Sequence, residues 1–518
     1  MSDAARTCWF RSGLAALLLG MVCSLGVAWG QGAAPAASPA PAAERAAEAV
    51  DEGDRWYVIE LAGSRAGYQR TKVTKAEGRV TTESEAKISM KRGAVGIEVR
   101  MSSEFVETAG HEPVSMRSVR VMGSGPVVTE YTFGAEGIEV ESTQGARTTK
   151  STRGLPEGVW LTPAAADAFM RQRVGAGAKE IVVRSIDPSS GPDPIVLTYV
   201  FEEKVTVQAL GREIPAWKYS FTASNLPQIK QTAWLDERGV LIRSEGDLMG
   251  RMVVRAAARE DALRDTAGPE IMVSTFVKPD RVIESPRRVK RAVYVLSVPE
   301  GEMPEVPSGG GQRAERVGPR EVRVTVDASG FMAAAEGVGD ERFLKATPVV
   351  DYKDPKVSEL RDRALAGKEG EGAAARAEAL RRFVYGFITA KHMGVGFDTA
   401  SGVARTRGGD CTEHAVLLAA LLRGDGIPAR VVTGLVYADA FAGATDVFGY
   451  HMWTQALLER EGVSGWVDLD ATFPGRVAFD ATHIALGASA LDDGDLERDM
   501  AKMVGLLGRL SIRVVETE

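Results

Sequence analysis

The first half of the chain is dominated by an alternation of apolar and polar residues. The alternation is clearest at residues 56–61, 96–101 and 195–201, and Gly, Asn and Asp turn signals separate such segments throughout residues 55–258. A period of two places apolar side chains on one face of a strand. The pattern therefore predicts a domain built on an antiparallel sheet.

One helix is expected within this region, at residues 162–173. Thr162 can cap it, Pro163 suits the first helical position, and Ala166, Phe169 and Met170 share a face. The region holds no cluster of His, Cys or paired carboxylates. It is interpreted either as a module that binds or positions an extended partner, or as a sheet that only supports the next domain.

Short strands follow at residues 292–298 and 321–326, and the Pro/Gly-rich loop 304–311 divides them. They predict a small β-unit that leads into the last domain. The basic run at residues 287–291 is interpreted as a solvated strand edge.

The period then changes to that of a helix. Apolar residues on one stripe predict a helix at residues 373–388, and Gly394 and Gly396 mark its exit. The stripe consists of Leu380, Phe383, Val384, Phe387 and Ile388.

A second, amphipathic helix is predicted to begin at Cys411. Asp410 and Glu413 form an Asp-x-x-Glu capping signal, and the helix ends near Gly424 and Gly426. Its buried stripe is Val416, Leu417, Ala420 and Leu421. The first turn of a helix favours a thiolate, although the two acidic neighbours oppose it.

The first thirty residues have the pattern of an export signal, with Arg6 and Arg11 before an apolar run at residues 14–27. Cys8 and Cys23 lie within this segment, so cleavage leaves one cysteine, Cys411. A lone thiol in an exported protein favours nucleophilic chemistry over a structural disulfide. We expect a periplasmic or extracellular protein without a membrane span in its mature form. Lipidation of Cys23 and an uncleaved anchor stay as alternatives that would tether it.

The composition, with 44% hydrophobic and 26% charged residues, is that of globular protein. A net charge of −7 argues against a nucleic-acid partner. The fold class predicted is α+β. The predicted organisation is a signal peptide at 1–30, an Ala/Pro linker at 31–50, a β-rich domain at 51–265, a small β-unit at 270–345 and a last domain at 346–518, which contains Cys411.

Two histidines compete as partner of the thiol. His414 lies on the same helix, three residues after Cys411, whereas His451 heads the strand that also carries Trp453. If the next strand is an antiparallel neighbour, its carboxylates can reach the ring of His451. His451 is therefore the better base.

The ordered segments at residues 409–415, 426–432, 451–453 and 466–472 resemble the transglutaminase-like superfamily. The resemblance covers about residues 373–479. It implies a papain-like fold in which Cys411 is the nucleophile, His451 the general base and acid, and Asp470 the orienting carboxylate. Ala471 stands where the family usually has Pro, so Asp468 stays an alternative third member.

The resulting chemistry is acyl transfer through a thioester at an exposed thiol cleft, without a cofactor. With water as the acceptor of the acyl group, the protein would be a peptidase or amidase. With an amine as the acceptor, it would be a transglutaminase. Substrates that fit are a protein side chain, a peptide bond or the peptide stem of a cell wall. The second oxyanion donor is unassigned, with Arg405 and Arg407 as candidates.

Two other classes of function stay open. Cys411, His414, His451 and an aspartate are chemically reasonable zinc ligands. A noncatalytic scaffold that binds envelope proteins is the second. The remaining histidines, His111, His392 and His483, stand apart from any second chemical group and are interpreted as surface or packing residues. Near the end of the chain, a helix is expected at residues 495–507 and a strand that docks on a sheet at residues 511–515.

Overall fold

The structure is a computed structural model, and the residues it describes fall into two compact units, one up to Ile271 and one from Met272. The predicted signal and linker, His392, Gly394, Gly396 and most of segment 495–507 lie outside the described residues. The described residues are 53–92, 95–122, 126–144, 147–247, 251–266, 268–270, 275–334, 337–368, 370–390, 398–441, 443–475, 479–491, 503 and 505–518.

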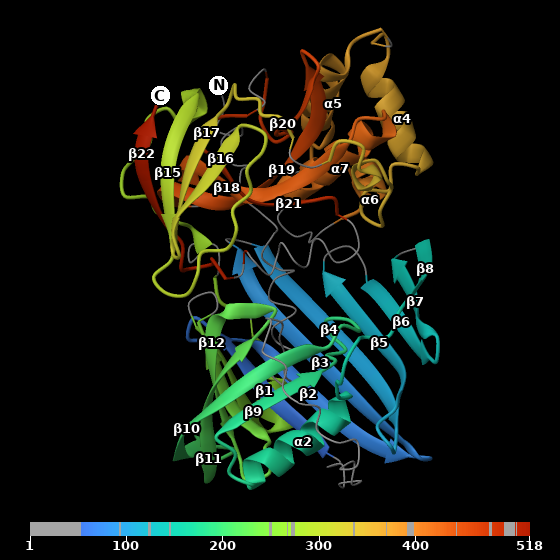
Figure 1. The fold of residues 1–518 in the computed structure, drawn as a ribbon, viewed down its shortest axis with the longest axis vertical. Coiled ribbons are helices and arrows are strands. Elements are labelled where there is room, and N and C mark those ends of the chain that lie inside the picture. Colours follow the sequence, from blue (N-terminus) through green and yellow to red (C-terminus); the bar gives the residue numbers. More distant parts are fainter. Residues whose placement is uncertain are drawn as a thin grey trace. The chain divides into compact units, whose positions relative to one another are not determined.

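The described part of the N-terminal unit contains one antiparallel sheet of 14 strands, in the order β8-β7-β6-β5-β4-β3-β2-β1-β14-β13-β12-β11-β10-β9 (Figure 1). Neighbouring strands are consecutive in sequence except β1 and β14, which join the two meanders. The predicted antiparallel sheet is confirmed. The elements are β1 (Gly53–Leu61), β2 (Ser64–Ala76), β3 (Arg79–Arg92), β4 (Val95–Thr108), β5 (Pro113–Met122), β6 (Pro126–Gly134), β7 (Gly137–Gln144), β8 (Arg147–Arg153), α2 (Pro163–Gly175), β9 (Glu180–Ser185), β10 (Ile195–Ala209), β11 (Arg212–Ala223), β12 (Leu226–Leu235), β13 (Leu241–Gly246), β14 (Met252–Ala257) and α3 (Arg259–Ala262).

Helix α2 begins where the sequence predicts, but a different side chain caps it. Thr162 is the residue before the helix and makes no capping bond through its side chain. Buried Glu107 of β4 instead accepts a hydrogen bond from the backbone N–H of Ala164 at 3.2 Å. Glu107 also contacts His111 at 2.6 Å, so the prediction that His111 stands apart is wrong.

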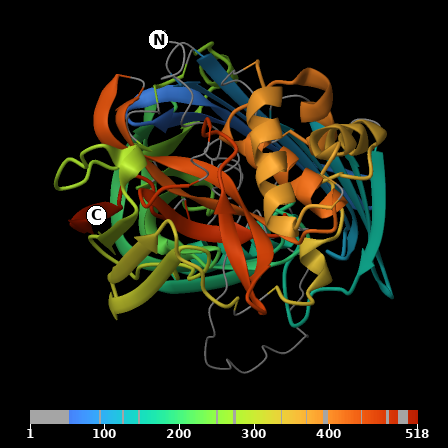
Figure 2. The ribbon, with the colours of Figure 1, turned by 90° about the horizontal axis from the view of Figure 1, so that it is seen from above.

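The described part of the C-terminal unit contains two four-stranded antiparallel sheets, ordered β16-β17-β15-β22 and β20-β19-β18-β21. Within this unit, helices α4 to α7 gather beside the second sheet, away from the first (Figures 1 and 2). The elements are η4 (Pro286–Arg288), β15 (Arg291–Ser297), β16 (Gln312–Gly318), β17 (Glu321–Asp327), η5 (Glu341–Phe343), α4 (Pro355–Leu365), α5 (Ala373–Phe387), α6 (Ala400–Thr406), α7 (Cys411–Gly424), β18 (Ala429–Phe441), β19 (Ala444–Arg460), β20 (Val463–Leu469), β21 (His483–Ser489) and β22 (Ser511–Thr517).

The two sheets share one hydrophobic core. Tyr294 of β15 meets Phe448 of β19 edge to face, with ring centroids 5.7 Å apart. The side-chain amide of Gln312 bonds to the backbone of Ala485 in the way that a neighbouring strand would. It accepts from the N–H of Ala485 at 2.8 Å and donates to the C=O of Ala485 at 2.9 Å. The predicted docking of the last strand is confirmed by the pairing of β22 with β15.

Two sequence predictions in this unit are wrong. Helix α7 is buried on every side from Cys411 to Arg423, so it is the central helix of the unit and has no solvent-exposed face over these residues. The basic run is not a strand edge, because Arg291 begins β15, which pairs with both β17 and β22, and Arg287 binds Asp480 at 2.7 Å. Its solvation holds for Arg288 and Lys290, which are exposed. Among the described residues, no helix is both long enough and apolar enough to cross a membrane.

Candidate active site

The start of helix α7 is held by the capping box that the sequence predicts. Asp410 accepts from the N–H of Thr412 at 3.0 Å, and Glu413 accepts from the N–H of Asp410 at 2.9 Å. Gly409 has φ +146°, and a Cβ there would lie 2.3 Å from the Glu413 side chain. A glycine is therefore needed for Glu413 to fold back, and Cys411 becomes the first residue of the helix.

Glu413 adds less negative charge beside Cys411 than its type suggests. Its carboxyl group is fully buried and accepts a second hydrogen bond, from the N–H of Asp398 at 3.2 Å. Burial, reinforced by the charge of Asp410, raises the pKa of Glu413 well above its usual value. This shift opposes ionisation of Glu413 and so weakens its opposition to a thiolate at residue 411.

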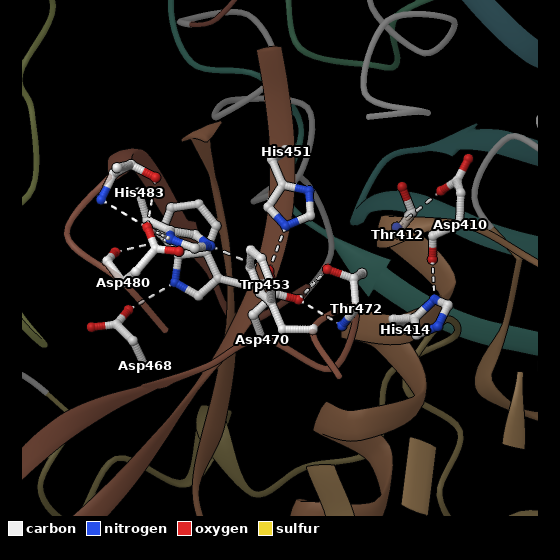
Figure 3. Close-up of polar contacts among 12 residues, drawn as sticks. Asp410, Thr412, His414, His451, Trp453, Asp468, Asp470, Thr472, Asp480 and His483 are labelled. Atoms are coloured by element: carbon white, nitrogen blue, oxygen red, sulfur yellow. Dashed lines mark hydrogen bonds and ion pairs between the residues drawn. The ribbon is translucent and has the colours of Figure 1, made fainter. Parts of the chain in front are cut away.

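His451 and Asp470 are brought together by the second sheet. Strands β19 and β20 are antiparallel neighbours, as expected, and Asp470 directly follows β20. Nε2 of His451 lies 2.7 Å from Oδ2 of Asp470. In Figure 3 the other ring nitrogen of His451 points to the side on which Asp410 and Thr412, the neighbours of Cys411, are drawn.

All the acceptor capacity of Asp470 is used. Its Oδ1 accepts from the N–H of Thr472 at 2.7 Å and from the hydroxyl of Thr472 at 2.6 Å, while Oδ2 faces two histidines. Burial disfavours ionisation, but the charges and hydrogen bonds of His451 and His483 outweigh it and hold the pKa of Asp470 well below its usual range. The turn forms with Ala471 in the position where proline was expected.

Helix α5 fixes the backbone of the same turn. The guanidinium of Arg381, which is fully buried, donates to the carbonyl groups of Asp470 at 3.1 Å, Phe473 at 2.9 Å and Gly475 at 2.6 Å. Both the side chain and the main chain of Asp470 are thus anchored.

Asp468, the alternative third member, has other partners. It accepts from Trp453 Nε1 and Gln455 Nε2, each at 2.7 Å, and from the N–H of Gly311 at 2.9 Å. Burial raises the pKa of this carboxyl group. Trp453 in turn stacks on His451 with centroids 6.1 Å apart, so Asp468 fixes the ring beside His451.

The other candidates point elsewhere. His414 Nδ1 lies 2.5 Å from the carbonyl of Asp410 on its own helix, as its spacing suggests. Arg405 binds Asp354 at 2.6 Å, and the guanidinium of Arg407 lies over the ring of Phe387 at 5.0 Å. Neither arginine is therefore assigned as an oxyanion donor.

Helix α7 packs against β19, with the hydroxyl of Thr454 donating to the carbonyl of Ala415 at 3.0 Å. This packing brings the helix that begins at Cys411 against the strand that carries His451. Cys411 exposes only 2% of its surface, and His451 and Asp470 are also buried. The expectation of an exposed thiol cleft is therefore wrong.

His483 is the residue that the sequence interpretation missed. It is completely buried at the start of β21, and its Nε2 lies 3.2 Å from Oδ2 of Asp470, so it does not stand apart. A signal was present, because Asp-Ala-Thr occurs at residues 470–472 and again at 480–482, directly before His483. Both copies form the same turn, in which the aspartate accepts from the threonine N–H and hydroxyl.

Among the described residues, one group of side chains could bind a metal ion, and this group differs from the predicted zinc ligands. His451, Asp470 and His483 offer ligand atoms within 4.8 Å of one another, without Cys411 or His414. Both ring Nε2 atoms already lie at hydrogen-bond distance from Asp470. A metal would have to replace these hydrogen bonds.

Residues 360–471 match the family model of the transglutaminase-like superfamily, so the chain carries a transglutaminase-like domain. No curated protein matches the chain. Weakly similar solved structures include the following three. A β-barrel-like protein with a domain of unknown function from Brucella abortus has a TM-score of 0.31 at 11% identity, and the match covers 39% of this chain and 94% of that one.

A protein of Cytophaga hutchinsonii that is provisionally described as a cysteine protease has a TM-score of 0.27 at 14% identity, and the match covers 44% of this chain and 89% of that one. The periplasmic domain of TgpA from Pseudomonas aeruginosa, bound to ethylmercury, has a TM-score of 0.26 at 16% identity, and the match covers 39% of this chain and 92% of that one.

Proposed function

We propose that this transglutaminase-like domain is a thiol acyl-transfer enzyme with Cys411 as nucleophile, His451 as general base and acid, and Asp470 as orienting carboxylate. The observation that carries the proposal is the 2.7 Å contact between His451 and Asp470 beside the helix that Cys411 begins. An anchored carboxylate fixes the tautomer of the imidazole and stabilises the imidazolium.

The reaction follows from these roles. The thiolate of Cys411 attacks an amide carbonyl and forms a C–S bond, while the positive end of the α7 helix dipole stabilises the oxyanion. The imidazolium of His451 gives its proton to the leaving amine as the C–N bond breaks. The thioester is then resolved by water, which releases an acid, or by a primary amine, which forms a new amide.

The substrates proposed are peptides or proteins, including the peptide stem of a cell wall. The apolar segment at residues 14–27 supports an exported location, because signal peptides carry such a run after basic residues. Hydrolysis and amine transfer use the same residues and differ only in the acceptor.

The test is to incubate the reduced protein with a peptide library, with and without a primary amine, and to compare the products by mass. Release alone indicates hydrolysis, and incorporation of the amine indicates transfer. Cys411→Ser and His451→Ala are the controls, and both are expected to be inactive. If no product forms with either acceptor, the scaffold hypothesis is favoured.

The metal hypothesis is tested on the same preparation by metal analysis, together with iodoacetamide labelling of Cys411 with and without a chelator. Stoichiometric zinc that protects the thiol would contradict the proposed enzyme.

A further inference from the structure

His483 lies between two carboxylate residues. Its Nε2 is 3.2 Å from Oδ2 of Asp470, and its Nδ1 is 3.0 Å from the carbonyl of Asp480 and 3.4 Å from Oδ1 of that residue. Carbonyl and carboxylate oxygens only accept hydrogen bonds, so each ring nitrogen must carry a proton to bond with them. The geometry therefore calls for the imidazolium form.

The second carboxylate is itself held in place. Asp480 accepts from the N–H of Thr482 at 2.9 Å and its hydroxyl at 2.6 Å, and it pairs with Arg287 at 2.7 Å. Burial opposes ionisation of Asp480, but His483 and Arg287 outweigh it and lower its pKa. A fixed anion thus stands behind the ring of His483.

Three aromatic rings enclose the ring of His483. Its centroid is 4.5 Å from that of Phe479 and 5.2 Å from those of Phe473 and Trp453. The faces of aromatic rings attract cations, and the enclosure leaves the imidazole little room to turn. Burial lowers the pKa of His483, but the carboxylates of Asp480 and Asp470 outweigh it and raise the pKa to about 9.

Resting on the proposed function, we infer that His483 is a positioning residue, which holds Oδ2 of Asp470 in the orientation that His451 needs. His451 and His483 both bond to this oxygen (Figure 3). The bond from His483 therefore limits rotation of the Asp470 carboxylate and keeps Oδ2 facing His451. Charge is also balanced, because the cations His483 and Arg287 match the anions Asp470 and Asp480.

Two substitutions separate the bond to Asp470 from the bond to Asp480. The amide nitrogen of His483→Gln can reach the position of Nε2 and donate to Asp470. That of His483→Asn lies near the position of Nδ1 and can donate only to the carbonyl of Asp480. The readout is the second-order rate constant for alkylation of Cys411 by iodoacetamide at about pH 6, which needs no substrate.

His483→Asn is expected to lower this rate constant about tenfold, the effect of losing one hydrogen bond to a charged group. His483→Gln should stay within about threefold of the unchanged protein, by the same reasoning. Equal rates in both variants, whether unchanged or equally reduced, would overturn the inference. Circular dichroism confirms that each variant is folded.

A second measurement reads the ring of His451 directly. The chain has five histidines, so the ring signals in a histidine-labelled protein can be assigned by substitution. In His483→Ala, Oδ2 of Asp470 loses its bond to position 483, so the ring signal of His451 should move away from its position in the unchanged protein. In His483→Gln the amide can restore the bond, so the signal should stay close to that position. The same His451 signal in both variants would overturn the inference, and this result decides alone if His483→Asn does not fold.

Failure of the proposed function gives a different result. In that case Cys411 would react no faster in the unchanged protein than in His451→Ala, whatever stands at position 483. The ring signal of His451 would still differ between His483→Ala and His483→Gln if the positioning role is correct.

Discussion

At the scale of single residues, two buried aspartates two positions apart have separate tasks. Asp470 faces His451, and Asp468 holds Trp453 and Gln455. Sequence alternation placed both on one face and left the choice open. What separates them is the end of β20 at Leu469, because Asp470 leaves the strand and enters a turn with Thr472.

Asp470→Asn is therefore expected to reduce the alkylation rate of Cys411 at about pH 6 by a hundredfold or more, since an amide neither stabilises the imidazolium nor fixes its tautomer. Asp468→Asn is the matched control. It should keep most of the reactivity and lower the free energy of unfolding by about 1–3 kcal/mol, because buried donors lose their acceptor. The reverse ranking would show that Asp468 is the third member.

At the scale of elements, the periodicity of the sequence predicted most of what positions the site. The capping signal at Asp410 placed Cys411 correctly at the start of α7, and the helix at 373–388 is α5. The burial of the whole circumference of α7 was harder to predict. Its small and polar residues outside the apolar stripe, such as Thr412 and His414, gave no sign in the sequence that they are buried. Their burial is imposed by packing of α4, α5 and α6.

Long-range contacts could not be predicted from local pattern. The bond between Arg287 and Asp480 joins residues 193 positions apart, and no local sequence pattern around Arg287 indicates that Asp480 is its partner. The same holds for His483, whose contact with Asp470 requires β21 to pair with β18 rather than with its sequence neighbour β20.

Gly434 of β18 shows how tightly these strands approach. It pairs with His451, and a Cβ at this position would lie 2.2 Å from the carbonyl of Ile484 and 2.7 Å from the ring of Trp453. Gly434→Ala should therefore lower the free energy of unfolding by about 1–3 kcal/mol. The control is Gly386→Ala in α5, where a Cβ meets nothing within 4 Å and about 0.5–1 kcal/mol of stabilisation is expected. Urea unfolding of both variants checks the pair, and equal effects would contradict the packing argument.

At the scale of the whole molecule, His483 links stability to pH. Its pKa is raised from 6.5 to about 9 on folding, so its contribution is complete below pH 6.5 and is lost as the pH rises towards 9. Asp470 and Asp480 have lowered pKa values, and their contribution is lost only in acid, below pH 3.8. The difference in unfolding free energy between the unchanged protein and His483→Gln should shrink from about pH 6 to about pH 9.5. Urea unfolding, with hydrogen exchange of β18 to β21 to report this unit, measures it, and a constant difference would contradict the raised pKa.

The small β-unit belongs to the same folding unit as the proposed site. Tyr294 packs on Phe448, Gln312 pairs with Ala485, and Gly311 donates to Asp468. A fragment of residues 272–518 is expected to unfold cooperatively, whereas residues 346–518 should lack a cooperative transition because this core is open. Near-ultraviolet circular dichroism during thermal unfolding distinguishes them, and similar transitions in both fragments would contradict the shared core.

The burial of Cys411 also limits the rate at which its thiol can react. A group with 2% of its surface exposed reacts only in the moments when the surrounding chain has opened, much as a buried amide exchanges its hydrogen. Adding more alkylating reagent should therefore accelerate modification only up to a ceiling, and that ceiling is the opening frequency of the protein. Under the proposed function, turnover would be bounded by the same frequency.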